Sequence, residues 1–266
     1  MKKVLAKITW FFGKLFGRRK YTSVDQEIRR KTVVSLSVFI ILLFSGYKAL
    51  MWLFDQPEDA AGVEKHLRKG LETNEKIFTK IFDDGHLVKT FPKSEAAQKV
   101  RVNGEIGLGS DFDYKNWVLN IKRVSGETLL VPLSEILALP KTEIIYDFKC
   151  VEGWSQVSHW AGVKFSDFVE KYNLHEEVKM GYVGLETPDK KYYVGIDTPS
   201  MMHPQTLLCY EMNNNYLPLI QGYPLRLIIP VKYGIKNLKR IGNVVFSNEK
   251  PHDYWAENGY DYYSGL

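Results

Sequence analysis

The sequence is poor in cysteine, with only Cys150 and Cys209 among its 266 residues. Two cysteines cannot supply the paired CxxC motifs of a zinc ribbon or the four thiolates of an iron–sulfur cluster. One disulfide between them remains open from composition alone, and so does a thiolate that binds a metal.

Several signature motifs are also absent. No GxGxxG follows a predicted strand, and the sequence contains no GxxxxGK[ST], HExxH, GxSxG or CxxCH. The six histidines show no spacing typical of metal ligands. These absences argue against a dinucleotide fold, a P-loop, a zinc protease, an α/β-hydrolase and a covalently bound haem.

Positive charge is scarce outside the N-terminus. Residues 1–31 hold ten Lys and Arg against Asp25 and Glu27, a net charge of +8. Because the whole chain carries +5, residues 32–266 carry −3. We therefore predict a basic tail over residues 1–31 and no nucleic-acid-binding face.

One long hydrophobic run follows this tail. Residues 33–54 carry a single charge, Lys48, and as a helix they would span roughly 33 Å, enough to cross a bilayer core. The run predicts a transmembrane helix over residues 32–54. A signal peptide is the alternative, although the run is longer than usual and no A-x-A cleavage site follows. The basic flank predicts a single-pass protein of the cell membrane, with a cytoplasmic N-terminus and the C-terminal bulk of the chain on the outer, periplasmic side.

The rest of the chain divides near residue 98. We predict a helical stalk or linker over residues 55–97, because apolar residues recur with helical spacing over 58–82. Residues 98–266 contain many short strand-like segments and few short helices, including a hairpin over 117–133 and a helix over 164–172. This pattern predicts an α+β, mixed and β-rich domain.

A set of separate blocks carries a family resemblance. They are FKCVEGWSQVSHWAGVKFSDF (148–168), LLCYEMNNNYLPLIQGYPLRLIIPVKYGIKNLKRIGNVVFS (207–247) and DYWAENGYDYYSG (253–265). In this order they resemble the molybdopterin domain of the sulfite oxidase fold, nearest to the bacterial exported methionine-sulfoxide reductase catalytic subunits. The resemblance implies a molybdenum-dependent oxidoreductase that binds molybdopterin with molybdenum. The implied reaction is oxygen-atom transfer on a small S- or N-oxide or a sulfite-like substrate.

The resemblance also implies residue roles. Cys150 matches the thiolate ligand of molybdenum, a role that suits a soft ligand and would exclude the disulfide with Cys209. The cofactor-binding residues that match by position are Thr187, Arg226, Asn237, Leu238 and Lys239, and Gln221 stands where the nearest branch carries Asn.

The N-terminal cofactor contacts of the family fall in a segment that differs here. Arg101 and Asn103 are the local candidates, and Lys232 and Lys236 would add positive charge near the phosphate. His159, close to Cys150 in sequence, is the candidate catalytic residue that would bind an oxyanion.

The implied chemistry needs a partner. Because the chain has no haem or flavin motif, we expect a separate electron-transfer protein, of haem type. Arg29-Arg30-Lys31 and Arg18-Arg19-Lys20 suggest twin-arginine export of a folded protein, without the full consensus. The competing hypothesis is a non-catalytic, membrane-tethered β-rich binding module derived from the same fold.

Overall fold

The computed structural model describes residues 23–109 and 112–266. It divides into two compact units, residues 1–57 and 58–266, which we describe separately. Most of the predicted basic tail, including Arg18 and Arg19, lies outside the described residues.

The first unit contains one long helix, α2 (Val24–Phe54). It begins eight residues before the predicted transmembrane segment because Ser23 caps it, accepting a hydrogen bond from the Gln26 backbone N–H, and Asp25 and Glu27 stabilise its first turn. Arg29, Arg30 and Lys31 are therefore helical. The helix is long and apolar enough to cross a membrane, a test that a signal sequence also passes.

The second unit begins with α3 (Lys65–Ile81), inside the segment predicted to be helical, and continues through η1 (Lys93–Glu95). The first sheet has the strand order β2-β1-β10-β5-β6. Its strands are β1 (Val118–Lys122), β2 (Thr128–Pro132), β5 (Tyr182–Glu186), β6 (Tyr193–Asp197) and β10 (Asn243–Ser247). The pair β1 and β2 is antiparallel, which confirms the predicted hairpin.

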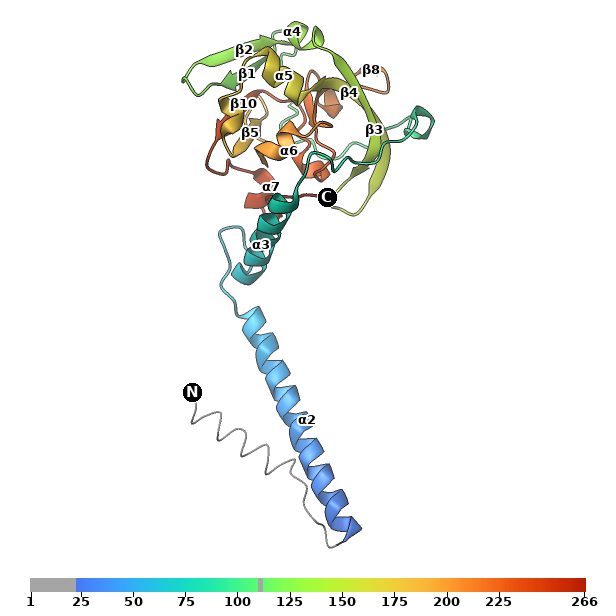
Figure 1. Ribbon diagram of the computed structural model, residues 1–266, viewed down its shortest axis with the longest axis vertical. Coiled ribbons are helices and arrows are strands. Elements are labelled where there is room, and N and C mark those ends of the chain that lie inside the picture. Colours follow the sequence, from blue (N-terminus) through green and yellow to red (C-terminus); the bar gives the residue numbers. More distant parts are fainter. Residues whose placement is uncertain (1–22, 110–111) are drawn as a thin grey trace. The chain divides into compact units, whose positions relative to one another are not determined.

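The second sheet has the order β3-β4-β7-β8, and β9 also pairs with β7. Its strands are β3 (Lys141–Lys149), β4 (Ser155–Lys164), β7 (Leu207–Met212), β8 (Asn215–Tyr216) and β9 (Arg226–Ile228). Figure 1 shows β3 and β4 running side by side along one edge of the domain. The turn that joins these two strands contains Cys150.

Short helices connect the strands. They are α4 (Leu133–Leu137), α5 (Phe165–Lys171), α6 (Thr198–Met202), α7 (Tyr254–Glu257), η2 (Glu177–Lys179), η3 (Leu219–Gln221) and η4 (Gly234–Lys236). The predicted helix over 164–172 is α5, which begins after Lys164. The mixed α+β class predicted from the sequence is confirmed.

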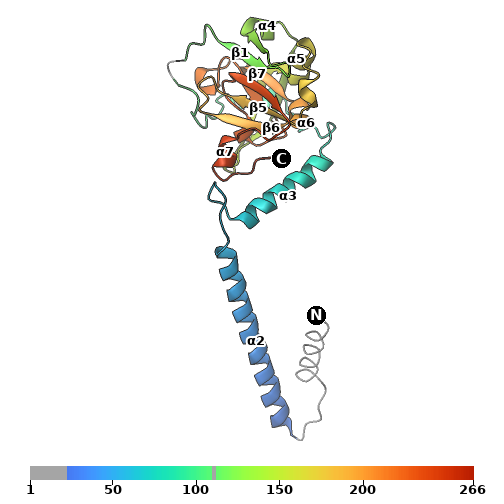
Figure 2. The ribbon, with the colours of Figure 1, turned by 90° about the vertical axis from the view of Figure 1, so that its left-hand side faces the viewer.

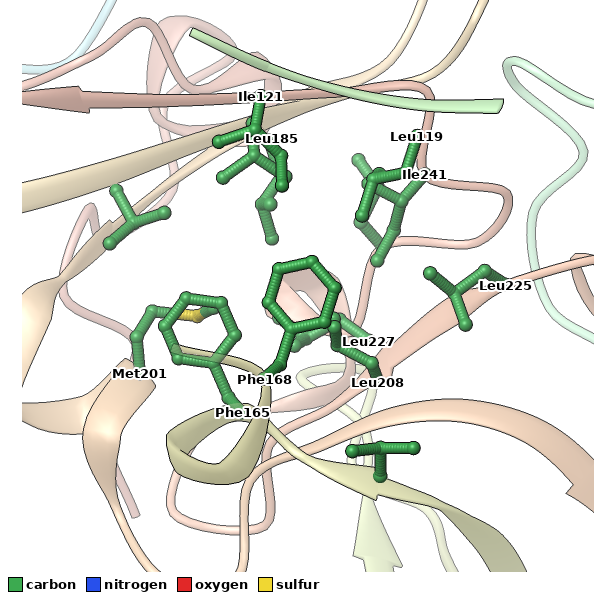
Figure 3. Packing of buried hydrophobic residues seen from close by; sticks show 14 of the residues in the cluster. Leu119, Ile121, Phe165, Phe168, Leu185, Met201, Leu208, Leu225, Leu227 and Ile241 are labelled. Atoms are coloured by element: carbon green, nitrogen blue, oxygen red, sulfur yellow. The ribbon is translucent and has the colours of Figure 1, made fainter. Parts of the chain in front are cut away.

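The main core lies between the two sheets. Phe165 and Phe168 of α5 stack with ring centroids 6.4 Å apart, and Figure 3 shows them beside Met201 and facing Ile121 and Leu185 of the first sheet. A smaller cluster on the other side of the second sheet includes Trp160, Tyr146 and Cys209. Because β4 is buried on both faces, its position and the adjoining turn are well fixed.

Candidate cofactor-binding site

A cavity of about 350 Å³ lies beside the β3–β4 turn. Four parts of the chain line it: residues 100–106, the β3–β4 turn with the strand residues on either side of it, the region of Gln221 and Arg226, and the loop at 234–239. Tyr192, Trp255 and Tyr260 complete the wall. Segments far apart in sequence therefore meet around one hollow, as in a typical ligand site.

Cys150 occupies the first position of the turn and lines the cavity. Its backbone N–H donates to the Trp154 carbonyl oxygen at 2.9 Å, and the Gly153 N–H donates back to the Cys150 carbonyl at 3.0 Å. Gly153 takes a positive φ of 87°, which this closed turn needs and which a residue with a Cβ would resist. The thiol therefore lies directly after the end of β3, at the wall of the cavity.

Alternate residues of β4 extend the same wall. Gln156, Ser158 and Trp160 all line the cavity, as expected for residues spaced by two along a strand. The Trp160 indole N–H donates to the Ser158 hydroxyl at 2.8 Å, which fixes the indole ring. The wall beside Cys150 is thus rigid and largely aromatic.

Arg226 supplies a buried positive charge. Its guanidinium lies 4.5 Å from the Trp160 ring centroid and donates to the Gln221 side-chain oxygen at 2.9 Å. Its Nε is buried and has no hydrogen-bond partner among the described residues. Burial lowers the pKa of Arg226, because desolvation disfavours the charged form. A buried cation with an unused donor is suited to an anionic ligand.

The loop that contains Asn237 and Lys239 forms the next wall. The Asn237 side chain accepts from the Ile229 N–H at 2.8 Å and so orders the loop against the end of β9. Gly222 has a φ of 101°, and a Cβ there would lie 2.9 Å from the Lys239 Cα. This close approach places Gln221 beside the loop.

Lys239 joins this loop to the segment at residues 100–106. Its ammonium donates to the carbonyl oxygens of Asn103 and Gly104, at 2.7 and 2.8 Å. Burial, and the charge of Arg226, lower the pKa of Lys239 to about 7. A dianionic phosphate nearby would favour the charged form of Lys239.

The segment at residues 100–106 is the most direct neighbour of the thiol. The Asn103 side-chain nitrogen lies 3.7 Å from the Cys150 sulfur, and Arg101 stacks on Trp154 with 4.5 Å to the ring centroid. Hydrogen bonds from Trp154 and then Asn103 lower the pKa of Glu152, which keeps this carboxylate ionised at the cavity wall. Both local candidates, Arg101 and Asn103, therefore line the cavity.

Three predicted site residues do not line the cavity. His159 points to the other side of β4, where its Nε2 lies 3.5 Å from a Glu143 carboxylate oxygen, and burial lowers its pKa. The Thr187 hydroxyl is bonded to Asp189 at 2.6 Å, and Leu238 is fully buried in the main core. Their proposed roles in catalysis or cofactor binding remain predictions without a contact to the cavity.

The two extra lysines are also directed elsewhere. Lys232 pairs with Asp197 at 2.7 Å, and Lys236 pairs with Asp253 inside the protein. Neither lysine lines the cavity. They anchor the loop to β6 and to the start of α7, rather than adding charge at the phosphate position.

Cys209 differs from Cys150 in its surroundings. It lies in β7, and burial raises the pKa of the Cys209 thiol to about 12. Both cysteines are free. Cys209 is therefore a neutral core thiol, and Cys150 is the cysteine that faces a cavity.

The sequence interpretation missed several lining residues. Tyr192 donates its hydroxyl to the Ile235 carbonyl at 2.7 Å, and Gln156 holds the segment at 100–106 by accepting from the Arg101 N–H at 2.8 Å. Gln156 and Ser158 were detectable from their period-two spacing with Trp154 and Trp160. No comparable signal in the sequence marks Tyr192.

The family model described as "Oxidoreductase molybdopterin binding domain" matches residues 107–255, more than half of the chain. The chain belongs to this family. Three relatives support the assignment. The putative protein-methionine-sulfoxide reductase subunit YedZ1 of Azospira oryzae is 30% identical over 70% of this chain and 70% of its own length. The MsrP catalytic subunits of Campylobacter jejuni and Ralstonia nicotianae are 30% and 28% identical over 60% and 56% of this chain.

The chain spans 60% and 50% of the lengths of those two MsrP proteins. Among solved structures, the chain is similar to the sulfane dehydrogenase SoxCD from Paracoccus pantotrophus, with a TM-score of 0.47 and 16% identity. The matched region covers 53% of this chain and 40% of the SoxCD chain. The protein is a molybdenum-dependent oxidoreductase of the molybdopterin-binding family, and molybdenum–molybdopterin is its cofactor. This membership favours the enzyme over the non-catalytic module.

The cavity residues fit that cofactor. The thiol of Cys150 is a soft donor at one wall, and Arg226 has an unused buried N–H donor at another. Arg101 and Lys239 add two more cationic side chains on the same hollow. A soft thiol and several cationic side chains on one cavity match a group that carries both a metal and a phosphate.

Proposed function

We propose that this enzyme catalyses oxygen-atom transfer on an S-oxide, with a methionine-sulfoxide group as the first candidate substrate. The observation that carries the proposal is Cys150 in a cavity shared with Arg101, Arg226 and Lys239. The names of the relatives add support, since all three are called methionine-sulfoxide reductase subunits. N-oxides and sulfite-like compounds are the alternative substrates.

The residues that line the cavity would have different roles. When bound, the cofactor supplies the oxygen-atom transfer chemistry. Cys150 would hold the metal, and Asn103, 3.7 Å from the sulfur, would donate a hydrogen bond that stabilises the thiolate. Arg226, Lys239 and Asn237 would hold the phosphate end, with Gln221 positioning Arg226 through the 2.9 Å hydrogen bond.

The aromatic part of the cavity lining suits the methyl and methylene groups of a methionine-sulfoxide substrate. Trp154 stacks on Phe148 with centroids 6.1 Å apart, and Trp255 meets Tyr260 edge-on at 5.0 Å. Aromatic rings make favourable contacts with methyl and sulfur groups. Arg101, which stacks on Trp154, would be available to the oxide oxygen.

The second part of the proposal concerns location and electron supply. α2 would anchor the protein as a single membrane span, with residues 1–31 cytoplasmic and the cofactor domain on the outer, periplasmic side. Electrons would come from a separate protein of haem type. A membrane tether would raise the effective concentration of the enzyme at a membrane-bound partner.

A substrate screen on the molybdenum-loaded, full-length protein tests the proposed chemistry. Reduced viologen would serve as electron donor with free methionine sulfoxide, peptide-bound methionine sulfoxide and an N-oxide, and ferricyanide would serve as acceptor with sulfite. We expect the highest kcat/KM with a methionine sulfoxide. Turnover of sulfite alone, with no oxidation of reduced viologen by any S-oxide, would overturn the proposal.

A further inference from the structure

Helix α3 has three distinct faces. The face that contacts the domain carries Arg68, Leu71 and Glu75. A second face carries lysines at spacings of four, seven and four residues, namely Lys65, Lys69, Lys76 and Lys80. Between these two faces lies a stripe of apolar side chains, which we call the apolar stripe: Leu67, Ile77, Phe78 and Ile81.

The apolar stripe is solvent-exposed. The exposed fractions of Leu67, Ile77, Phe78 and Ile81 are 51, 51, 49 and 60%. Single exposed apolar residues are ordinary, but these four lie on one side of one helix, with Gly70 and the exposed Asn74 between Leu67 and the other three. Figure 2 shows α3 along the outside of the domain.

The domain holds α3 firmly, so the stripe is not a fraying end. Arg68 donates to the carbonyl oxygens of Tyr260 and Ala256 and pairs with Asp59 at 2.7 Å. Glu75 pairs with Lys250 at 2.6 Å. Directly after the helix, Phe82 packs on the main core. Burying the stripe inside the domain would break these contacts.

Charge distinguishes between possible occupants of the stripe. Residues 65–81 contain five Lys or Arg and two Glu, a net charge of +3, although residues 32–266 together carry −3. An apolar stripe beside a lysine face is the pattern of a helix that lies in the headgroup region of an anionic membrane. An apolar protein groove would not select for the lysines.

Chain connectivity favours the same occupant. Only Asp55–Glu64 separate α2 from α3, a connection of ten residues that can extend at most about 35 Å. If α2 spans the membrane, α3 is held within reach of its surface. This step rests on the anchor under the proposed function.

We propose that α3 lies in the membrane interface, with Leu67, Ile77, Phe78 and Ile81 among the lipid chains and the lysine face at anionic headgroups. One consequence concerns the cofactor cavity. Arg68 binds the backbone of Tyr260, and Tyr260 lines the cavity. The interfacial helix would thus hold the cavity rim close to the membrane, where a membrane-bound electron donor would meet it.

Depth-sensitive fluorescence on the full-length protein in anionic nanodiscs tests the proposal. A Phe78→Cys variant would carry an environment-sensitive label, and Thr79→Cys, one residue further round the helix, is the matched control. Cys150 and Cys209 are buried, which favours labelling at the introduced cysteine. We expect brominated lipids to quench the label at position 78 at least threefold more strongly than the label at 79. Replacing Lys69 and Lys76 with Gln should reduce that quenching.

Equal iodide access at positions 78 and 79, without lipid quenching, would overturn the proposal. Protection of position 78 from both iodide and brominated lipid would also overturn it, because a protein partner or a second copy would then cover the stripe. A label at Leu42→Cys in α2 tests the anchor separately. Lipid quenching at position 78 but not at position 42 would refute the membrane anchor and support the interfacial helix. Lipid quenching at position 42 but not at position 78 would support the anchor and refute the interfacial helix.

Discussion

Lys239 donates a hydrogen bond to the Asn103 carbonyl oxygen at 2.7 Å, and so joins two walls of the cofactor cavity that are 136 residues apart in sequence. Asn103 in turn reaches toward the Cys150 sulfur. One lysine therefore connects the region expected to bind the phosphate with the region expected to bind the metal. Its charge and its two carbonyl contacts make it a sensitive point of the site.

The pKa of Lys239 predicts a pH dependence of anion binding. In the cofactor-free protein this pKa is about 7, and a bound dianion would raise it. Binding then takes up a proton above pH 7, so affinity is full below that pH and falls as pH rises from 7 toward 9. Titration calorimetry with inorganic phosphate at several pH values measures this effect.

Lys239→Arg is the control for that experiment, because its guanidinium stays charged throughout the range. The ratio of wild-type to variant affinity cancels the titration of phosphate itself. We expect this ratio to fall as pH rises above 7. A ratio that stays constant from pH 6 to 9 would show that Lys239 does not titrate there.

Arg226→Met should separate cofactor binding from stability. The guanidinium is buried and its pKa is lowered by desolvation, so an apolar side chain of similar length should leave the cofactor-free protein at least as stable. Loss of a charge-assisted hydrogen bond, about 1.5–3 kcal/mol, should weaken cofactor binding about ten- to hundred-fold. Thermal denaturation and cofactor content measure the two effects. Reduced stability with unchanged cofactor content would contradict this view of Arg226.

The pair of Lys236 and Asp253 should matter for stability instead. Both side chains are buried, so removing one partner leaves an uncompensated charge. We expect Lys236→Met to lower the free energy of unfolding by about 3–5 kcal/mol. Denaturant titration measures it, with Lys171→Met on the surface of α5 as the matched control. A change as small as that of the control would mean that the pair is not formed.

His159 provides a test of the cavity boundary. It lies on the side of β4 away from the cavity, beside Glu143, so we expect His159→Gln to keep kcat within about twofold of wild type. A hundredfold loss of kcat in a well-folded variant would restore the catalytic role suggested by its position in the sequence.

Secondary structure could be predicted from the sequence where a local pattern of residues is typical of only one kind of element. The β1–β2 hairpin and α5 follow directly from turn residues and helical spacing. β4, the longest strand of the second sheet, was not predicted as a strand. Burial on both faces removes the alternation of polar and apolar residues that marks a half-buried strand.

The loop at residues 234–239 was identified by the family resemblance. The segment at residues 100–106 was identified from its own Arg and Asn residues, Arg101 and Asn103. Position alone could not show that Leu238 is buried in the core while Asn237 and Lys239 line the cavity. Nor could it show that Lys236 is already paired with Asp253, 17 residues away. These directions depend on tertiary contacts, which neither spacing nor composition contains.

The central claim is that Cys150, in this cavity, is the thiolate that holds molybdenum. Elemental analysis and molybdenum X-ray absorption on the wild-type protein, Cys150→Ser and the matched control Cys209→Ser test it most directly. We expect one sulfur neighbour fewer at molybdenum, and loss of turnover, in Cys150→Ser alone, with circular dichroism unchanged. Full sulfur coordination and activity in Cys150→Ser, or the same loss in Cys209→Ser with its fold intact, would contradict the claim.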